Sequence, residues 1–375
     1  MQHDLTTRRR RWPLMLIILA VMLAGGWSGA WYYAANRAET LIAGWREREA
    51  KAGRVHSCGS QTVSGFPFRF EMRCADPGLE LKSAEPPLSI KAKDVLITAR
   101  VWQPTLLTSE VTGPLTIAEP GQPATITANW RHAQTEVRGI PVSPEQVTIV
   151  IDQPVVDRMA GTEAQRLFNA ARAELNGRML EGSAVYNPVI EVTLKLVTAV
   201  APTLHPVTEL PLDADITAVL RGLKDFAPKP WPDRFREIQA AGGRIEITNA
   251  RVKQGETIAL ANGALGLSPR GRLDGQLRLT VANLVNLLPA LGLDGRSPQV
   301  ANKQLDNAAS RLDRITPGLG GIARQNAVPA LVAGLNFIGQ PAEIEGKRAI
   351  TLPLRFNDGV VTLGPIPLGQ TAPLF

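Results

Sequence analysis

The feature that most constrains this chain is an uncharged segment close to its N-terminus. No Asp, Glu, Lys or Arg occurs in Leu14–Ala35, and Leu14–Ala24 consists entirely of apolar side chains. A helix rises about 1.5 Å per residue, so ~22 residues are enough to cross the roughly 30 Å hydrocarbon layer of a bilayer. The segment therefore predicts one membrane-spanning helix, and the rest of the chain must fold outside the bilayer.

Basic residues before this segment predict its orientation. Four consecutive arginines precede it: Arg8, Arg9, Arg10 and Arg11. Cytoplasmic flanks of membrane helices carry an excess of Lys and Arg, so the N-terminus is expected to remain in the cytoplasm. We predict a single-pass protein of the bacterial inner membrane. Residues 1–12 form its cytoplasmic tail, residues 13–35 its anchor, and the bulk of the chain lies in the periplasm.

Aromatic residues at the far end of the segment support a retained anchor. Three of them are adjacent: Trp31, Tyr32 and Tyr33. Such clusters are typical of the belts that membrane proteins place at the bilayer surface. The alternative is a cleaved signal peptide, because the most apolar stretch is short and Ser28–Ala30 resembles a small-residue cleavage site. In both cases the bulk of the chain is exported.

The net charge does not indicate a nucleic-acid partner. Of the total of +7, residues 1–12 supply +3, from four arginines less Asp4. The remaining +4 is spread over the rest of the chain, and no later segment concentrates Lys and Arg between aromatic residues. A nucleic-acid-binding surface would do so. We therefore expect no nucleic acid among the partners.

The two cysteines of the chain, Cys58 and Cys74, predict a disulfide, because exported proteins fold under oxidising conditions. Apolar residues alternate with polar ones from Phe66 to Cys74, which is typical of a strand with one buried face. With a turn at Ser64–Gly65, a hairpin centred near residue 66 would place the two cysteines opposite each other. A redox pair is disfavoured because the spacing is not Cys-x-x-Cys.

Period-2 alternation recurs along most of the chain. It is clear at 95–101, 126–130, 147–151, 190–196, 244–252, 257–267, 271–281, 350–356 and 360–363. The pattern predicts a mainly β protein with helices (α+β), in which a few helices cover large twisted antiparallel sheets. After a stalk helix over 36–55, we expect a first β-rich subdomain over 56–205. A second, with helices, covers 206–375.

Four further helices are expected beyond the stalk. Thr162–Gln165 resembles a capping box, and the apolar stripe that follows it predicts a helix as far as Leu175. Trp231–Ile238 begins with a proline at its first turn, which favours a helix start. Leu284–Leu293 and Leu319–Ile338 are apolar enough to cover a sheet.

Three segments carry a resemblance to known families. The string Gly65–Phe70 (GFPFRF), Cys74 and Asp76-Pro77, together with Leu363–Gly369 (LGPIPLG), resembles an alphaproteobacterial family of unknown function with a membrane anchor. That resemblance implies an envelope protein and no particular activity. Ala261–Val281 is similar to strand pairs of AsmA-like β-groove envelope proteins, which implies the handling of lipid in an apolar trough. An ordinary amphipathic meander also explains this segment.

The sequence shows no catalytic motif. The four histidines are isolated from one another, and the chain lacks the spacings of zinc sites, phosphate loops and nucleophile elbows. Arg69 and Arg73 share the polar face of the predicted hairpin, where they could meet lipid headgroups or solvent. We expect no enzyme, no cofactor and no metal. The first hypothesis is a protein that handles lipid or another hydrophobic ligand in a β-lined groove, and the alternative is a periplasmic scaffold that binds other envelope proteins.

Overall fold

The fold was analysed in a computed structural model, which describes residues 12–375 except 83, 85, 141, 142, 162, 205, 228, 284–338 and 365. The described chain forms two compact units, Met1–Ala124 and Thr125–Phe375. The arginines at positions 8–11 and the helices predicted over 284–293 and 319–338 lie outside the described residues. The expected subdomain boundary at 205/206 falls between two strands that pair with each other in the second unit.

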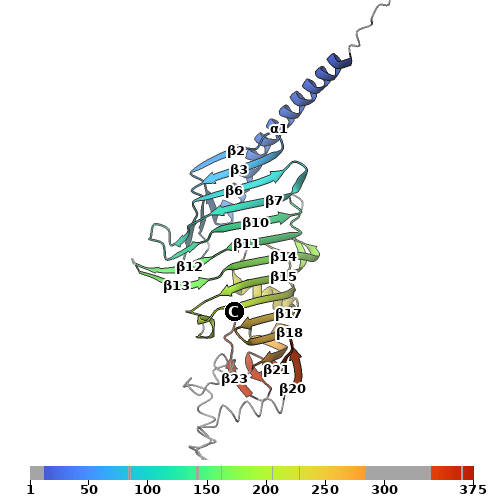
Figure 1. The fold of residues 1–375 in the computed structure, drawn as a ribbon. Helices are drawn as coiled ribbons and strands as arrows, with labels where there is room; N and C mark the ends of the chain where they lie inside the picture. Colours follow the sequence, from blue (N-terminus) through green and yellow to red (C-terminus); the bar gives the residue numbers. More distant parts are fainter. Residues whose placement is uncertain are drawn as a thin grey trace, which may run out of the picture. The chain divides into compact units, whose positions relative to one another are not determined.

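The first unit contains one long helix and strands from two antiparallel sheets (Figure 1). The helix is α1 (Trp12–Lys51), which contains the only candidate membrane span among the described residues. One sheet has the order β1 (Arg54–Ser57), β4 (Gly78–Leu81), β5 (Leu88–Lys91) and β8 (Leu115–Ala118). The other has the order β2 (Ser60–Ser64), β3 (Arg69–Ala75), β6 (Asp94–Arg100) and β7 (Gln103–Thr112).

The second unit is built mainly from a long antiparallel sheet. Its strands follow one another in the order β10 (His132–Arg138), β11 (Gln146–Asp152), β14 (Arg172–Ser183), β15 (Tyr186–Ala199), β16 (Leu212–Arg221), β17 (Arg244–Gln254), β18 (Thr257–Leu267), β19 (Leu273–Ala282), β21 (Lys347–Asn357), β22 (Val360–Leu363) and β23 (Ile366–Gln370). A short strand, β20 (Gln340–Ile344), also pairs with β21. A smaller sheet contains β9 (Ile126–Asn129), β12 (Val155–Ala160) and β13 (Glu163–Asn169).

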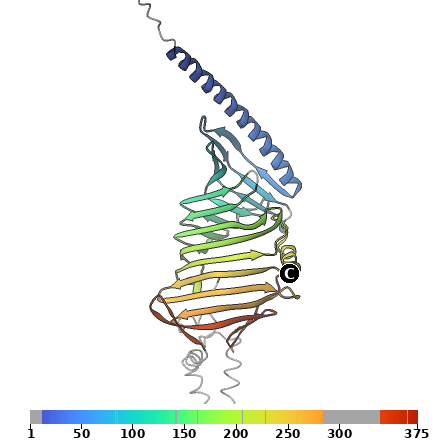
Figure 2. The ribbon, with the colours of Figure 1, turned by 90° about the vertical axis from the view of Figure 1, so that its right-hand side faces the viewer.

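Helices are few in the described part of the second unit. The short 3-10 helix η1 (Pro206–Glu209) precedes β16, and α2 (Trp231–Ala240) connects β16 to β17. Gln239 of α2 donates a hydrogen bond to the carbonyl oxygen of Ser268, just after β18. Accordingly, Figure 2 shows α2 at one end of the strands rather than across the middle of the sheet. The predicted mainly β class with large antiparallel sheets is confirmed, as is the helix that begins at Trp231.

The helix predicted from Thr162 to Leu175 is wrong. Residues 163–169 form β13, and Arg172 begins β14, which pairs with β11 on one side and β15 on the other. From Arg172 onward, charged or amide side chains alternate with Ala173, Leu175 and Gly177. Two paired neighbours and this alternation outweigh a helical stripe, because the strand buries its apolar side chains on one face.

Two predicted boundaries also differ from the structure. The stalk helix ends at Lys51, and Gly53 then adopts a φ of 79°, so the chain reverses and Arg54 and Val55 enter β1. In the cysteine hairpin, Phe66 and Phe68 lie in the turn between β2 and β3, which begins only at Arg69. Apolar and polar residues alternate as predicted, but the segment from Phe66 to Phe68 is not part of a paired strand.

A closed apolar core lies near β20. Ile258, which is 1% exposed, packs with Ala282, Ile344 and Ala349. Removal of a large buried side chain leaves a cavity that neighbouring strands fill only in part.

We therefore expect Ile258→Ala to lower the free energy of unfolding of the second unit by about 2–5 kcal/mol, as measured by urea denaturation. Val360→Ala is the control, because Val360 lies on an exposed position of β22 and should change stability by no more than about 0.5 kcal/mol. Equal effects of the two substitutions would contradict this assignment of the core.

Candidate functional site

The long sheet of the second unit has one apolar face. Strand register aligns its side chains in rows that cross the sheet, and the central row is Ile149, Leu175, Leu194, Ile216, Ala250, Ala261, Leu279 and Leu352. A parallel row contains Ile151, Ala173, Leu196, Ala214, Val252, Ala259, Val281 and Ile350. We call this surface the apolar face. Its residues come from strands spread over about 200 positions of sequence, and alternation alone brings them together.

Accessibility changes along the apolar face. Val281 and Leu352, on β19 and β21, are fully buried. Ile149, Leu194 and Ile216 are only half-buried, and Leu175 remains 39% exposed. Aliphatic side chains in the middle of a sheet are usually buried completely, so this part of the face leaves apolar surface accessible for a ligand or partner.

Over β11, β14, β15 and β16 the opposite face of the sheet is polar and paired, whereas towards β18, β19 and β21 it also carries the apolar core around Ile258. Arg172 on β14 contacts Asp152 on β11 at 2.7 Å, and Lys195 on β15 contacts Asp215 on β16 at 3.6 Å. Cross-strand hydroxyl pairs such as Thr280 with Thr351 continue this pattern. These side chains satisfy one another at the surface, so the polar face is a solvated face and the two sides of the sheet differ sharply in chemistry.

A small pocket opens on the apolar face near its accessible part. It has a volume of about 200 Å³ and is lined by apolar side chains that include Val147, Met179, Ile190 and Phe226. Typical ligand pockets enclose roughly 300–1,000 Å³, so this one cannot enclose a whole ligand. It can take the end of a hydrocarbon chain that continues along the apolar face.

A second, larger hollow lies beside α2. It has a volume of about 490 Å³, and its lining mixes Gln239, Arg244 and Asp274 with Leu265 and several glycines. Charged and apolar groups share this lining, and it is wide open to solvent. The hollow therefore resembles the space left between a short helix and the strand ends more than a built site.

A cluster of ion pairs fixes the loop that carries Phe226. Arg234 of α2 is buried, donates to the carbonyl oxygen of Asp225 at 2.8 Å and contacts Glu237 at 2.8 Å. Glu237 also accepts from the backbone N–H of Lys224 at 2.7 Å and pairs with Lys229. The loop before α2 is thus held at both ends of Phe226, and this holds Phe226 in the wall of the pocket.

The charge of Glu237 is central to this cluster. Burial raises the pKa of Glu237, but hydrogen bonds from the Lys224 N–H, Lys229 and Arg234 outweigh it and lower the pKa from 4.5 to about 2. A carboxylate with a lowered folded-state pKa stabilises the fold above its ordinary pKa. That contribution is lost as the pH falls through about 2.

Glu237→Gln should therefore lower the free energy of unfolding by about 1.5–3 kcal/mol at neutral pH, measured by denaturant unfolding. The difference from the wild-type protein should shrink as the pH falls from 4.5 towards 2. Asp233→Asn is the control on the same helix, because the Asp233–Arg236 pair is exposed and contributes at most about 1 kcal/mol. A difference that does not depend on pH would argue against ionised Glu237 as the stabilising group.

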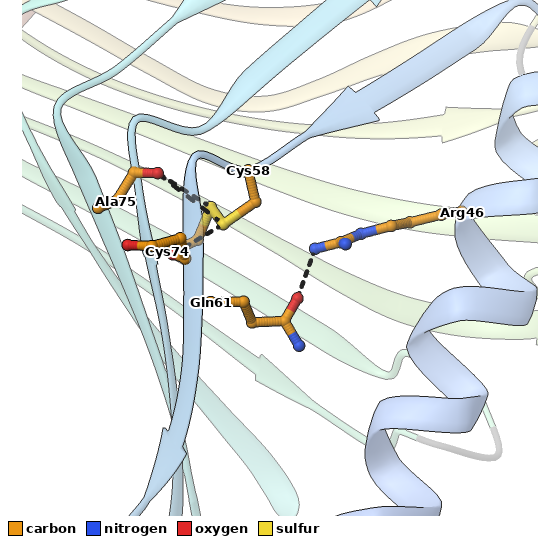
Figure 3. Close-up of a disulfide and its surroundings, with 6 residues drawn as sticks. Arg46, Cys58, Gln61, Cys74 and Ala75 are labelled. Carbon is orange, nitrogen blue, oxygen red and sulfur yellow. Dashed lines mark hydrogen bonds between the residues drawn. A yellow bond between two sulfur atoms is a disulfide. The ribbon is translucent and has the colours of Figure 1, made fainter.

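The predicted disulfide is present in the first unit (Figure 3). Cys58 and Cys74 are bonded, with their Cα atoms 5.7 Å apart. They are not register partners, because Cys74 pairs with Gln61 while Cys58 lies just before β2. Arg46 of α1 donates to the side-chain oxygen of Gln61 at 2.8 Å, so the same hairpin is also attached to the long helix.

Replacement of both cysteines by serine should lower the free energy of unfolding of the first unit by about 3 kcal/mol, because the bond closes a loop of about 15 residues. The loss is measured by thermal unfolding of the full chain. The double variant is compared with the wild-type protein in oxidising buffer and with the wild-type protein after reduction. If the oxidised wild-type protein and the double variant unfold at the same temperature, the bond does not contribute to stability.

The hairpin also contacts α1 through aromatic residues. Trp31 is buried, stacks on Phe70 with ring centroids 5.2 Å apart and donates to the carbonyl oxygen of Arg69 at 3.2 Å. Tyr32 and Tyr33, by contrast, are exposed. All three aromatic residues are predicted from the sequence to lie at a membrane surface, but Trp31 packs within the protein. The sequence does contain one signal for this packing. Trp27 and Trp31 are four residues apart, which places both side chains on one side of a helix.

The remaining candidates from the sequence are dispersed. Arg69 pairs with Glu71 at 2.9 Å and Arg73 with Asp94 at 3.7 Å, both on the surface of the first unit. Within the part of the chain that the structure describes, no three His, Cys, Asp or Glu side chains gather as a metal site requires.

The chain was compared with known proteins. A family model described as "Uncharacterized protein conserved in bacteria (DUF2125)" matches residues 31–372. A search of curated proteins finds no match. The family match covers both compact units and begins at the buried tryptophan of α1.

Proposed function

The chain belongs to DUF2125, a family conserved in bacteria, and we propose that this member is a non-enzymatic, membrane-anchored envelope protein that holds lipid on its apolar face. In this proposal α1 crosses the inner membrane, and both units lie in the periplasm. The observation that carries the proposal is the apolar face itself. Its rows of aliphatic side chains continue from strand to strand, yet they remain half-accessible over β11, β14, β15 and β16.

The chemistry of the apolar face favours an acyl chain over a compact ligand. A long hydrocarbon needs a continuous strip of aliphatic surface and no precisely placed polar groups. The register supplies such a strip, and the pocket at Val147 and Phe226 offers an apolar recess for one end of the chain. A scaffold that binds an envelope protein is the alternative, and the same experiment separates the two.

We expect the wild-type full chain, purified in mild detergent from bacterial membranes, to retain phospholipid detectable by native mass spectrometry. Leu175→Glu should reduce the retained lipid by about tenfold, because a carboxylate in the centre of the apolar face must be desolvated when an acyl chain covers it. The matched control is Val197→Glu. Val197 is 44% exposed, and it lies on the neighbouring strand but on the opposite, polar face, beside Arg172.

Equal lipid retention in the two variants would overturn the apolar face as the lipid site. A wild-type protein that carries no lipid but co-purifies reproducibly with a second protein would favour the scaffold. Circular dichroism of all three proteins controls for folding, since both substituted positions are partly exposed.

A further inference from the structure

Three aromatic side chains lie at one end of the β2–β3–β6–β7 strands in the first unit. Phe66 and Phe68 lie in the turn between β2 and β3, and Trp102 lies in the turn between β6 and β7. Phe68 is 60% exposed and Trp102 64% exposed, and their ring centroids are 6.4 Å apart. A backbone hydrogen bond from Val101 to Phe68 at 3.0 Å ties the two turns together. We call Phe66, Phe68 and Trp102 the aromatic tip.

The aromatic tip is attached to α1 at a defined level of that helix. Trp27 donates from its indole N–H to the carbonyl oxygen of Pro67, within the tip, at 3.0 Å. Trp31 packs edge-on against Phe66, with ring centroids 5.5 Å apart. These contacts place the tip beside residues 27–31 of the helix rather than beyond its apolar segment.

This level lies within the last few residues of the candidate span, inside its outer boundary. Trp27 follows Trp12 by 15 residues, which at about 1.5 Å per residue is roughly 22 Å along the helix. If the hydrocarbon layer begins near Trp12, its thickness of roughly 30 Å brings its far boundary to about residue 32. Residues 27–31 precede that boundary, so the tip lies just inside the depth where acyl chains meet headgroups.

Two arginines lie next to the aromatic tip, at the ends of β3 and β6. Arg69 follows Phe68 directly, and Arg100 is its register partner on β6; both are exposed. Aromatic rings at the bilayer boundary with arginines one step farther out are typical of protein surfaces that enter a membrane interface, because the guanidinium groups can reach lipid phosphates.

We propose that the aromatic tip inserts into the outer boundary of the same bilayer that α1 crosses, with Arg69 and Arg100 at the level of anionic headgroups. The inference rests on the membrane anchoring in the proposed function. A helix alone would leave α1 and the hairpin attached to it free to tilt together in the bilayer. A second contact with the bilayer fixes the hairpin against the membrane surface.

The test uses tryptophan quenching by brominated lipids in the full chain. Wild-type protein and the variants Trp102→Phe and Trp231→Phe are reconstituted into vesicles of phosphatidylethanolamine and phosphatidylglycerol that contain a phospholipid brominated near the headgroup end of its acyl chains. The emission of one tryptophan is the difference between wild-type protein and the variant that lacks it. Trp231 is the control, because it is an exposed tryptophan of α2 in the second unit.

We expect the Trp102 emission to fall by about half or more in brominated vesicles, since insertion at the headgroup boundary brings the ring within reach of the bromine atoms. The Trp231 emission should stay unchanged. Phe68→Ser, which removes a neighbouring apolar ring from an exposed position, should weaken the quenching of Trp102.

The outcomes separate this inference from the proposed function. Unquenched Trp102 with quenched span tryptophans would overturn the aromatic tip as a membrane contact and leave the anchor in place. If no tryptophan is quenched, both the anchor and the tip are wrong. Leu175→Glu should leave the quenching of Trp102 intact, because it alters lipid retention on the apolar face alone.

Discussion

Cross-strand register is the constraint on which the second unit depends. In each antiparallel pair, residues directly opposite one another point to the same side of the sheet, so one strand's alternation must be in phase with the next. From β11 to β21 the phase is kept, even across the bulges near Thr217 and Ile247. The two chemically distinct faces exist only because of this continuity. Loss of phase at one strand would expose every apolar side chain beyond it.

The sheet differs from a usual β domain in how far its apolar face is closed. Near β19 and β21 the face is buried, and the core around Ile258 lies on the other side of the same strands. Near β14 the face is still partly accessible. A protein whose only requirement was stability would gain from closing this region, because each buried aliphatic side chain contributes about 1.5–3 kcal/mol. The open region is therefore the part of the unit where function is most reasonably sought.

Much of the strand content could be predicted from the sequence, because alternation is a local property. The strands at 190–196 and 257–267 follow directly from it. The helix predicted from Thr162 failed because Leu167, Phe168, Ala171 and Leu175 satisfy a helical spacing by coincidence. Contacts between segments that are far apart in the sequence leave no periodic pattern in it. Trp27 with Pro67, and Glu237 with Lys224, depend on how the chain returns on itself, and only the structure shows them.

The order of strands in the second unit also affects how such a chain can change in length. Between β14 and β19 each strand pairs with the next one in sequence, so most contacts of this region are local and its strands form a linear array. Addition or removal of two consecutive strands would return the chain to the same edge with the same phase, and the apolar face would simply become longer or shorter. Removal of one strand would reverse the direction of every strand after it. This architecture can therefore change the length of its apolar face by gaining or losing whole hairpins.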